Sequence, residues 1–406
     1  MVNNMIDWWE YYNFKEEPYL STEPLKEKNE LELFWGRREQ ISKIKNYLTG
    51  RAVKTILLTG LPGVGKTTLL YKIFSLEKGF VYINLSEISS ILDSEIIIAN
   101  AFIETISKID DYKSREFREI LENDITETSG ESSSGGFSSV VKLETSSTSG
   151  RTTQKIKNLE IVKLIKRCAK YFESKKIRLS VVIDETDFFH DSIAELISLV
   201  QRIKLNLPAH STLIMANRDN DKKLSKDFTD TKSLVRSVFK KYIDLEPVWK
   251  VGKDDIKQLL KERFTIGKPK RGFKFPITKT GSNVIDLLSN GNYKLLLQYL
   301  EHALIEGNSK KEKTPLEKNF IKEELFKEFP ETATKNKQTL SILSYLKKTP
   351  THASDSKFQK QVKLKKTALN NKLNEMAEEK LIIKESIKTG LAQPYIITEK
   401  GKLYID

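Results

Sequence analysis

A glycine-rich run of eight residues has the spacing of a loop that holds phosphate groups: Gly60-Leu61-Pro62-Gly63-Val64-Gly65-Lys66-Thr67. An apolar strand is predicted before it, at 54–59, and a helix after it, as far as Phe74. Backbone N–H groups in such a loop point at the phosphates, and the helix dipole favours their negative charge. Lys66 would reach the β- and γ-phosphates, and Thr67 would offer its hydroxyl to Mg²⁺. The sequence therefore predicts ATP and Mg²⁺ as cofactors, bound by Gly60, Pro62, Gly63, Val64, Gly65, Lys66, Thr67 and Thr68.

A second chemical element lies more than a hundred residues downstream. The run 180–185 is an apolar strand that ends in two carboxylates, Asp184 and Glu185. Asp184 is placed to hold the metal together with Thr67, and Glu185 is placed to polarise an attacking water as a general base. An acidic pair can also simply end a strand, so this assignment depends on the phosphate loop upstream.

Elements that could position these residues alternate along the chain. Further strands are predicted at 80–84, 212–215 and 242–245, with helices near 154–173 and 192–205. Strands and helices that alternate in this way indicate an α/β fold, a doubly wound parallel sheet. The serine- and glycine-rich residues 126–153 interrupt the pattern as an insertion, either a disordered loop or a protruding hairpin, and carry no predicted chemistry.

The domain organisation follows from the same pattern. Residues 1–40 are expected to form an aromatic N-terminal strap, and 41–248 the α/β core. Strand signals end after Pro247, so 249–306 is predicted as a small helical domain. A lysine- and glutamate-rich linker at 307–335 would lead to a third unit at 336–406.

The order of these elements resembles an AAA+ ATPase over residues 30–306. The run Met215-Ala216-Asn217 ends the strand that follows the carboxylate pair, and 36–39 (Gly-Arg-Arg-Glu) resembles the family's adenine-side motif. The resemblance implies that Asn217 is the polar sensor between carboxylates and phosphates. It also implies that 249–306 is the helical lid, with Lys294 as a basic second sensor at a helix start, where relatives more often carry arginine.

AAA+ relatives also complete a neighbouring subunit's site with an arginine between the sensor strand and the last strand. Arg218 and Arg236 both lie in that interval, and Arg236 matches the position better. Either arginine can equally be an ordinary surface residue.

The C-terminal residues 336–406 hold 14 lysines against 7 acidic residues, a net charge of +7 out of +14 for the whole chain. Apolar spacing predicts three short helices followed by a hairpin between 381–384 and 395–398. This order is similar to a winged-helix DNA-binding domain. The resemblance implies that the third helix and the hairpin contact DNA through Lys366, Thr367, Asn370, Asn371, Asn374, Lys384 and Lys388. A winged helix that binds protein instead is the alternative.

Core, lid and basic winged helix in this order resemble the archaeal origin-recognition and replication-initiator ATPases. The resemblance implies slow, partner-stimulated ATP hydrolysis that switches the chain between states on double-stranded DNA, as a homo-oligomer or with a related ATPase subunit. Two alternatives remain: a transposition-regulator or defence ATPase, as found in mobile elements, and a nucleotide-sensing transcription regulator. Their DNA footprints would differ. An initiator should protect a repeated origin sequence, a transposition or defence ATPase should cover DNA of any sequence, and a transcription regulator should protect a promoter.

Composition excludes some kinds of site and segment. Cys168 is the only cysteine, which excludes an intrachain disulfide and a zinc–cysteine cluster and suggests a core position. No stretch of about 18 apolar residues is found, and the N-terminus lacks a basic segment followed by an apolar run. We expect a soluble cytoplasmic protein with no membrane partner.

Overall fold

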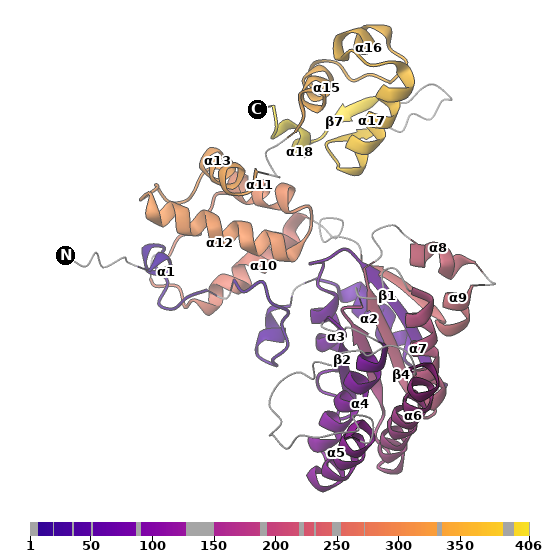
Figure 1. The fold of residues 1–406 in the computed structure, drawn as a ribbon. Coiled ribbons are helices and arrows are strands. Elements are labelled where there is room, and N and C mark those ends of the chain that lie inside the picture. Colours follow the sequence, from indigo (N-terminus) through magenta and orange to yellow (C-terminus); the bar gives the residue numbers. More distant parts are fainter. Residues whose placement is uncertain are drawn as a thin grey trace. The chain divides into compact units, whose positions relative to one another are not determined.

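The structure is a computed structural model, and it describes all residues except 1–6, 19, 35, 50–51, 87–90, 127–149, 187–192, 219–222, 231–232, 246–252, 272, 331–334, 385–393 and 406. The side chains of 91–93, 124–126, 150–160, 193, 223, 225 and 253–257 are also left undescribed. The chain divides into two compact units, one of residues 24–247 and the other of residues 1–23 with 248–406. Each unit is described separately below, and Figure 1 shows their elements.

The first unit is built on a five-stranded parallel sheet. Its strands are β1 (Lys54–Gly60), β2 (Phe80–Asn84), β3 (Ser180–Asp184), β4 (Thr212–Asn217) and β5 (Lys241–Leu245), in the order β2-β3-β4-β1-β5. The central strands are buried along almost their whole length, as expected when helices cover both faces of a parallel sheet.

Helices cover the two faces of the sheet unequally (Figure 1). One face packs against α2 (Arg38–Tyr47) and α3 (Lys66–Phe74), through side chains such as Ile44 and Phe74. The other packs against α4 (Ile91–Ser107), α5 (Asp111–Thr126), α6 (Gly150–Ser174), α7 (Ile193–Asn206) and α9 (Leu234–Val238). A further helix, α8 (Lys223–Thr229), contacts α9.

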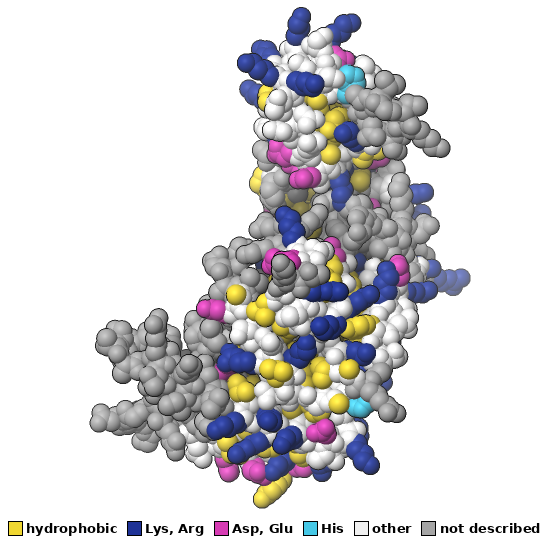
Figure 2. Space-filling model, turned by 90° about the vertical axis from the view of Figure 1, so that its right-hand side faces the viewer, with side chains coloured by type: hydrophobic (Ala, Val, Ile, Leu, Met, Phe, Trp, Pro, Cys, Tyr) yellow, Lys and Arg dark blue, Asp and Glu magenta, His cyan; other side chains and the backbone are white. Residues whose placement is uncertain are grey.

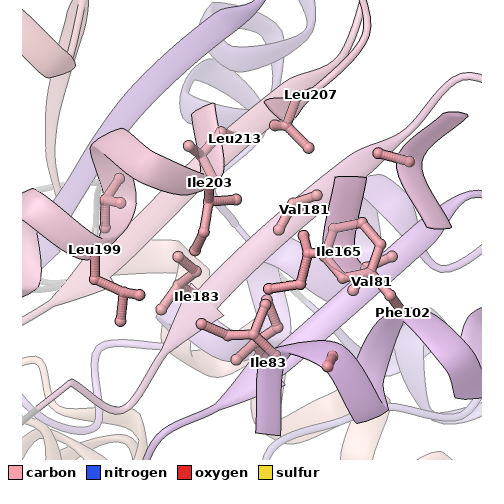
Figure 3. Packing of buried hydrophobic residues seen from close by; sticks show 14 of the residues in the cluster. Val81, Ile83, Phe102, Ile165, Val181, Ile183, Leu199, Ile203, Leu207 and Leu213 are labelled. Carbon is pink, nitrogen blue, oxygen red and sulfur yellow. The ribbon is translucent and has the colours of Figure 1, made fainter. Parts of the chain in front are cut away.

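The larger of these two cores gives the sheet its rigidity. Figure 3 shows strand residues Val81, Val181 and Leu213 meeting helix residues Phe102 and Ile165 in one continuous cluster. Cys168 lies in the same cluster and is fully buried, as the sequence analysis expected. Burial raises the pKa of its thiol to about 12. The strand ends above this core are therefore held at fixed spacings.

Most elements agree with the sequence prediction to within a few residues. The sequence analysis left unassigned the stretch 91–126, which α4 and α5 occupy, and the stretches of α8 and α9. The two ends of the serine-rich segment 126–153 are helical, since α5 ends at Thr126 and α6 begins at Gly150. Residues 127–149, and with them the choice between loop and hairpin, lie outside the described residues.

The helical part of the second unit comprises α10 (Lys253–Ile266), α11 (Lys279–Ser289), α12 (Tyr293–Ser309) and α13 (Lys318–Glu328). Helix α13 falls inside the segment expected to be a linker at 307–335, which is a correction to that boundary. Its side chains Ile321 and Leu325 are fully buried, and the helix packs on α11 and α12. Two apolar residues one turn apart are enough to dock a short helix, whatever the charge of its outer face.

The N-terminal segment divides between the units and does not form one strap over 1–40. Helix α1 (Trp8–Tyr11) contacts α12, and the Tyr12 hydroxyl donates a hydrogen bond to the Leu304 carbonyl oxygen at 3.1 Å. The Phe14 ring lies 5.4 Å from the ring of Phe264 on α10, measured between centroids. The 3-10 helix η1 (Glu30–Leu33) instead contacts α3 of the first unit.

The last part of the chain forms its own small core. Helices α15 (Lys337–Lys348), α16 (Ser356–Val362) and α17 (Lys366–Glu378) precede an antiparallel pair, β6 (Ile382–Lys384) and β7 (Tyr395–Ile397), and a final helix α18 (Glu399–Lys402). Their buried residues, among them Leu343, Phe358 and Leu373, make one cluster. Three helices and a hairpin are thus present in the predicted order. Across the described part of the chain, no helix combines the length and apolar character needed to span a membrane.

Candidate nucleotide site and basic C-terminal surface

The glycine-rich loop joins the end of β1 to the start of α3, as its spacing predicts. Gly63 and Gly65 have φ values of 74° and 88°, left-handed conformations that favour glycine. The Lys66 ammonium donates hydrogen bonds to the carbonyl oxygens of Gly60 at 2.8 Å and Leu61 at 3.1 Å. The loop therefore holds a positive charge at the N-terminus of α3, where phosphates would bind.

The Asp184 carboxylate is held by three donors at the carboxyl end of β3. Its Oδ2 accepts hydrogen bonds from the Thr67 hydroxyl at 2.6 Å and the Tyr82 hydroxyl at 3.0 Å, and its Oδ1 accepts from the Glu185 backbone N–H at 2.9 Å. The side chain is almost completely buried. Thr67 and Asp184, predicted as the metal pair from positions 117 residues apart, are thus brought into direct contact.

Tyr82 is a site residue that the sequence analysis missed. It lies on β2, next to β3, and its ring belongs to an aromatic cluster with Tyr71, at 4.9 Å between centroids. Burial and the neighbouring Asp184 charge raise the pKa of the Tyr82 hydroxyl. The hydroxyl consequently remains protonated and able to donate to Asp184 at neutral pH.

Glu185, the predicted general base, has a left-handed backbone with φ 53°. A non-glycine residue in this region is uncommon and is found preferentially at functional sites. Its Oε2 lies 3.6 Å from the guanidinium of Arg218, and both side chains are partly exposed. Arg218, one of the two arginines predicted to act on a neighbouring subunit, lies beside this carboxylate of its own chain, and its role toward a neighbour stays a prediction.

Asn217 ends β4 and is buried. Its side-chain N–H₂ donates a hydrogen bond to the Thr186 hydroxyl, one residue beyond Glu185. The predicted sensor therefore connects β4 to the turn that carries the predicted base. Thr186 was not singled out from the sequence.

Two further contacts hold the loop from outside. Arg37, in the predicted adenine-side motif, is almost fully buried and donates a hydrogen bond to the Val64 carbonyl oxygen at 3.0 Å. The Thr68 hydroxyl accepts one from the Leu25 backbone N–H at 3.2 Å. The segment upstream of α2 thus contacts the loop directly, and whether it also contacts adenine remains a prediction.

Two further residues were predicted for the ATPase, Arg236 and Lys294. Arg236 lies on α9, exposed, with its guanidinium 4.6 Å from the centre of the Phe228 ring. Lys294 is exposed in the first turn of α12, which belongs to the other unit. Their proposed roles toward a neighbouring subunit and as a second sensor stay predictions.

The candidate DNA-contacting residues of α17 lie on one polar face of that helix. Lys366, Thr367, Asn370, Asn371 and Asn374 are exposed along α17, and Lys384 is exposed at the end of β6. Asn374 differs from the others because its Oδ1 accepts a hydrogen bond from the Tyr395 hydroxyl at 3.0 Å, which ties α17 to β7. Lys388 lies outside the described residues.

The residues at the nucleotide site fit Mg²⁺ bound to a nucleotide. A hydroxyl and a carboxylate oxygen 2.6 Å apart are hard oxygen ligands, and a magnesium ion typically takes only one or two such groups plus phosphate oxygens and water. Among the described residues, no group of three or more His, Cys, Asp or Glu side chains gathers as a separate metal centre. The chemistry that this arrangement supports is phosphoryl transfer to water at the carboxyl edge of a parallel sheet.

Comparison with known proteins agrees with this geometry. The family model described as AAA ATPase domain matches residues 33–214, which include the loop and both carboxylates. This segment is therefore an AAA ATPase domain, and the predicted AAA+ α/β fold of the core is confirmed. A search of curated proteins found no match.

Solved structures are similar at low identity. The Aeropyrum pernix ORC2 protein is 10% identical with a TM-score of 0.47, covering 97% of this chain and 98% of that one. Cdc6p from Pyrobaculum aerophilum is 16% identical, with a TM-score of 0.44 and coverage of 91% and 92%. A variant of Thermotoga maritima RuvB is 14% identical, with a TM-score of 0.45 and coverage of 95% and 98%. We infer nothing further from scores this low.

Proposed function

We propose that this chain is a DNA-binding ATPase in which ATP binding and slow hydrolysis at the core control the grip of a winged-helix domain, 336–406, on duplex DNA. The observation that carries the ATPase half is the contact between the Thr67 hydroxyl and the Asp184 carboxylate at 2.6 Å, beside Lys66. It supports one site for Mg²⁺ and the β- and γ-phosphates.

Hydrolysis in this proposal uses Glu185 as the base. Its backbone is left-handed, and its N–H donates a hydrogen bond to Asp184 Oδ1. We therefore assign the two carboxylates separate roles. The guanidinium of Arg218 lies 3.6 Å from the Glu185 carboxylate and would compete with the attacking water for it. Turnover would then be slow until a partner subunit or DNA changes this pairing. Bound Mg²⁺ would stabilise the charge of the transferring phosphoryl group.

The DNA-binding half rests on charge and on the side chains that α17 exposes. Residues 336–406 carry a net charge of +7, and Asn370 and Asn371 present amide groups able to pair with an adenine edge. Lys366 and Lys384 would contact phosphates on either side. The order of ATPase core, helical unit and basic C-terminal domain favours a role like that of the origin-recognition and replication-initiator ATPases.

Fluorescence anisotropy of the full chain with MgATP and duplex DNA tests this assignment. Replacing Lys366 and Lys384 together with alanine should lower the slope of log affinity against log salt by up to about 2, at about 0.9 per lost phosphate contact. The matched control replaces Lys347 and Lys348, exposed at the end of α15, and removes the same charge. Equal slopes in the two variants would show that only total charge matters and would reject the α17 interface.

An initiator should also choose its site. Nuclease footprinting on a genomic library should reveal protection of a repeated sequence, and Asn370→Ala should weaken binding about 10-fold or more at that sequence alone. Protection of DNA without sequence preference would favour the transposition or defence role. Protection confined to promoters would favour a transcription regulator.

A further inference from the structure

Residues 161–178 are one of the strongly basic segments of this chain. Residues 161–178 hold seven basic residues and one acidic residue, a net charge of +6 in eighteen residues. Residues 336–406 carry +7, and residues 263–279 carry six basic residues and no acidic one. The first segment lies in and just after α6 of the ATPase core, more than 150 residues from the proposed DNA-binding domain.

Four of these basic side chains form a stripe on the outer face of α6: Lys163, Lys166, Arg167 and Lys170. All four are exposed, and their spacing of i, i+3, i+4 and i+7 places them on one side of the helix. The opposite side carries Leu164, Ile165 and Cys168 into the core. Figure 2 views the side of the core where α6, α7 and α9 lie, and Lys and Arg predominate over Asp and Glu across its lower part.

This stripe differs from an ordinary solvated helix. The neighbouring helix α5 alternates its charges, with ion pairs between Arg115 and Asp111 and between Lys113 and Glu116. No ion pair between described residues involves Lys166, Arg167 or Lys170. Like charges at this spacing destabilise a helix. A surface that keeps such repulsion is suited to a partner that supplies the compensating negative charge.

We propose that the α6 stripe is a second nucleic-acid contact, which binds the phosphate backbone of duplex DNA. The four side chains cover about 10 Å along the helix axis, at 1.5 Å per residue, and this spans about three phosphates of one strand at 3.4 Å each. The exposed stripe offers Lys and Arg heads without a pocket or an aromatic platform. The stripe therefore fits a regularly spaced polyanion such as the phosphate backbone, and its contacts would not depend on the base sequence.

This inference rests on the proposed DNA binding and adds a site to it. The test is anisotropy of the full chain with MgATP and duplex DNA between 50 and 200 mM salt, comparing wild type with a variant carrying Lys166→Ala, Arg167→Ala and Lys170→Ala. Loss of three phosphate contacts lowers the salt slope by up to about 2.7, so the wild type should lose about 40-fold more affinity over this range than the variant. Alanine preserves the helix, and unchanged ATP binding confirms that the core is folded.

The matched control removes three cations from the ion-paired helix α5, with Lys113→Ala, Arg115→Ala and Arg118→Ala. If this control lowers the slope as much as the α6 variant, the effect is one of net charge and the stripe is not a contact. If the α6 variant keeps the wild-type slope while the Lys366 and Lys384 variant loses it, the inference is overturned and the proposed function stands. If the wild-type chain binds no duplex DNA, both fail, and an acidic protein partner replaces DNA as the candidate.

Discussion

Tyr82→Phe removes a single hydroxyl from the candidate metal site and tests whether Asp184 depends on it. The hydroxyl of the half-buried Tyr82 donates to Oδ2 of the almost fully buried Asp184 at 3.0 Å. A hydrogen bond to a charged acceptor contributes about 1.5–3 kcal/mol, which corresponds to roughly 10- to 150-fold in an equilibrium. Loss of a group that orients a metal ligand typically costs about 10- to 100-fold in metal affinity, in agreement with this range.

The expected result is therefore a shift of the Mg²⁺ requirement. ATPase rate measured against Mg²⁺ concentration should show a half-saturation point raised by about 10-fold or more. ATP binding measured without Mg²⁺ should be nearly unchanged, because Lys66 and the loop are untouched. A role in packing alone would lower the melting temperature and leave the Mg²⁺ requirement as it is.

Tyr71→Phe is the matched control for this experiment. Its ring lies in the same aromatic cluster, 4.9 Å from that of Tyr82, so the two variants remove the same atom from neighbouring rings. Only Tyr82 donates a hydrogen bond to Asp184 among these two. Equal Mg²⁺ requirements in wild type, Tyr82→Phe and Tyr71→Phe would refute the positioning role of Tyr82.

Three further outcomes are expected. Lys66→Ala should abolish nucleotide binding in calorimetry, because the loop loses the cation nearest the phosphates, and retained micromolar affinity would reject the site. Glu185→Gln should bind ATP but hydrolyse it about 100-fold more slowly or worse, the usual contribution of a general base, and unchanged turnover would mean that Glu185 only ends its strand. Burial raises the pKa of Glu95 to about 7, although the Arg202 guanidinium lies 2.7 Å away. Protonated Glu95 therefore stabilises the folded chain by about 3 kcal/mol below pH 4.5, and this contribution is lost as pH rises through 7. Melting curves of Glu95→Gln between pH 5 and 8 should be flatter than those of the wild type, and parallel curves would contradict this.

The residues of the phosphate loop and the carboxylate pair could be predicted because each acts through local sequence. The loop needs glycine at left-handed positions such as Gly63 and Gly65, and the pair needs an apolar strand before Asp184. Both requirements are visible in a single stretch of chain. The same holds for β1, β3 and β4, whose runs are mostly apolar and buried.

Tyr82 could not be predicted, because its role depends on strand register. In the sheet, Tyr82 pairs with Val182 and Asn84 with Asp184, so Tyr82 and Asp184 lie diagonally on one face. Nothing within β2 alone specifies this pairing. The Arg218–Glu185 contact was missed for a related reason, since it joins the ends of β4 and β3 through two turns.

Helix α13 shows the limit of reasoning from composition. Its lysine- and glutamate-rich outer face suggested a linker, whereas Ile321 and Leu325 dock it onto the neighbouring helices. The N-terminal aromatic residues were recognised as a structural segment, but their partner helices α10 and α12 lie some 250 to 300 residues away in sequence. Long-range docking of this kind leaves no local signal.

The central claim is that nucleotide at the core controls DNA binding by the chain. The most direct measurement is anisotropy of the full chain with duplex DNA at low salt, in parallel with MgATP, with MgADP and without nucleotide, for wild type and Lys66→Ala. The wild type should bind most tightly with MgATP, and Lys66→Ala should bind more weakly and not respond to nucleotide. Absence of DNA binding by the wild type, or equal affinity in all three nucleotide conditions, would contradict it.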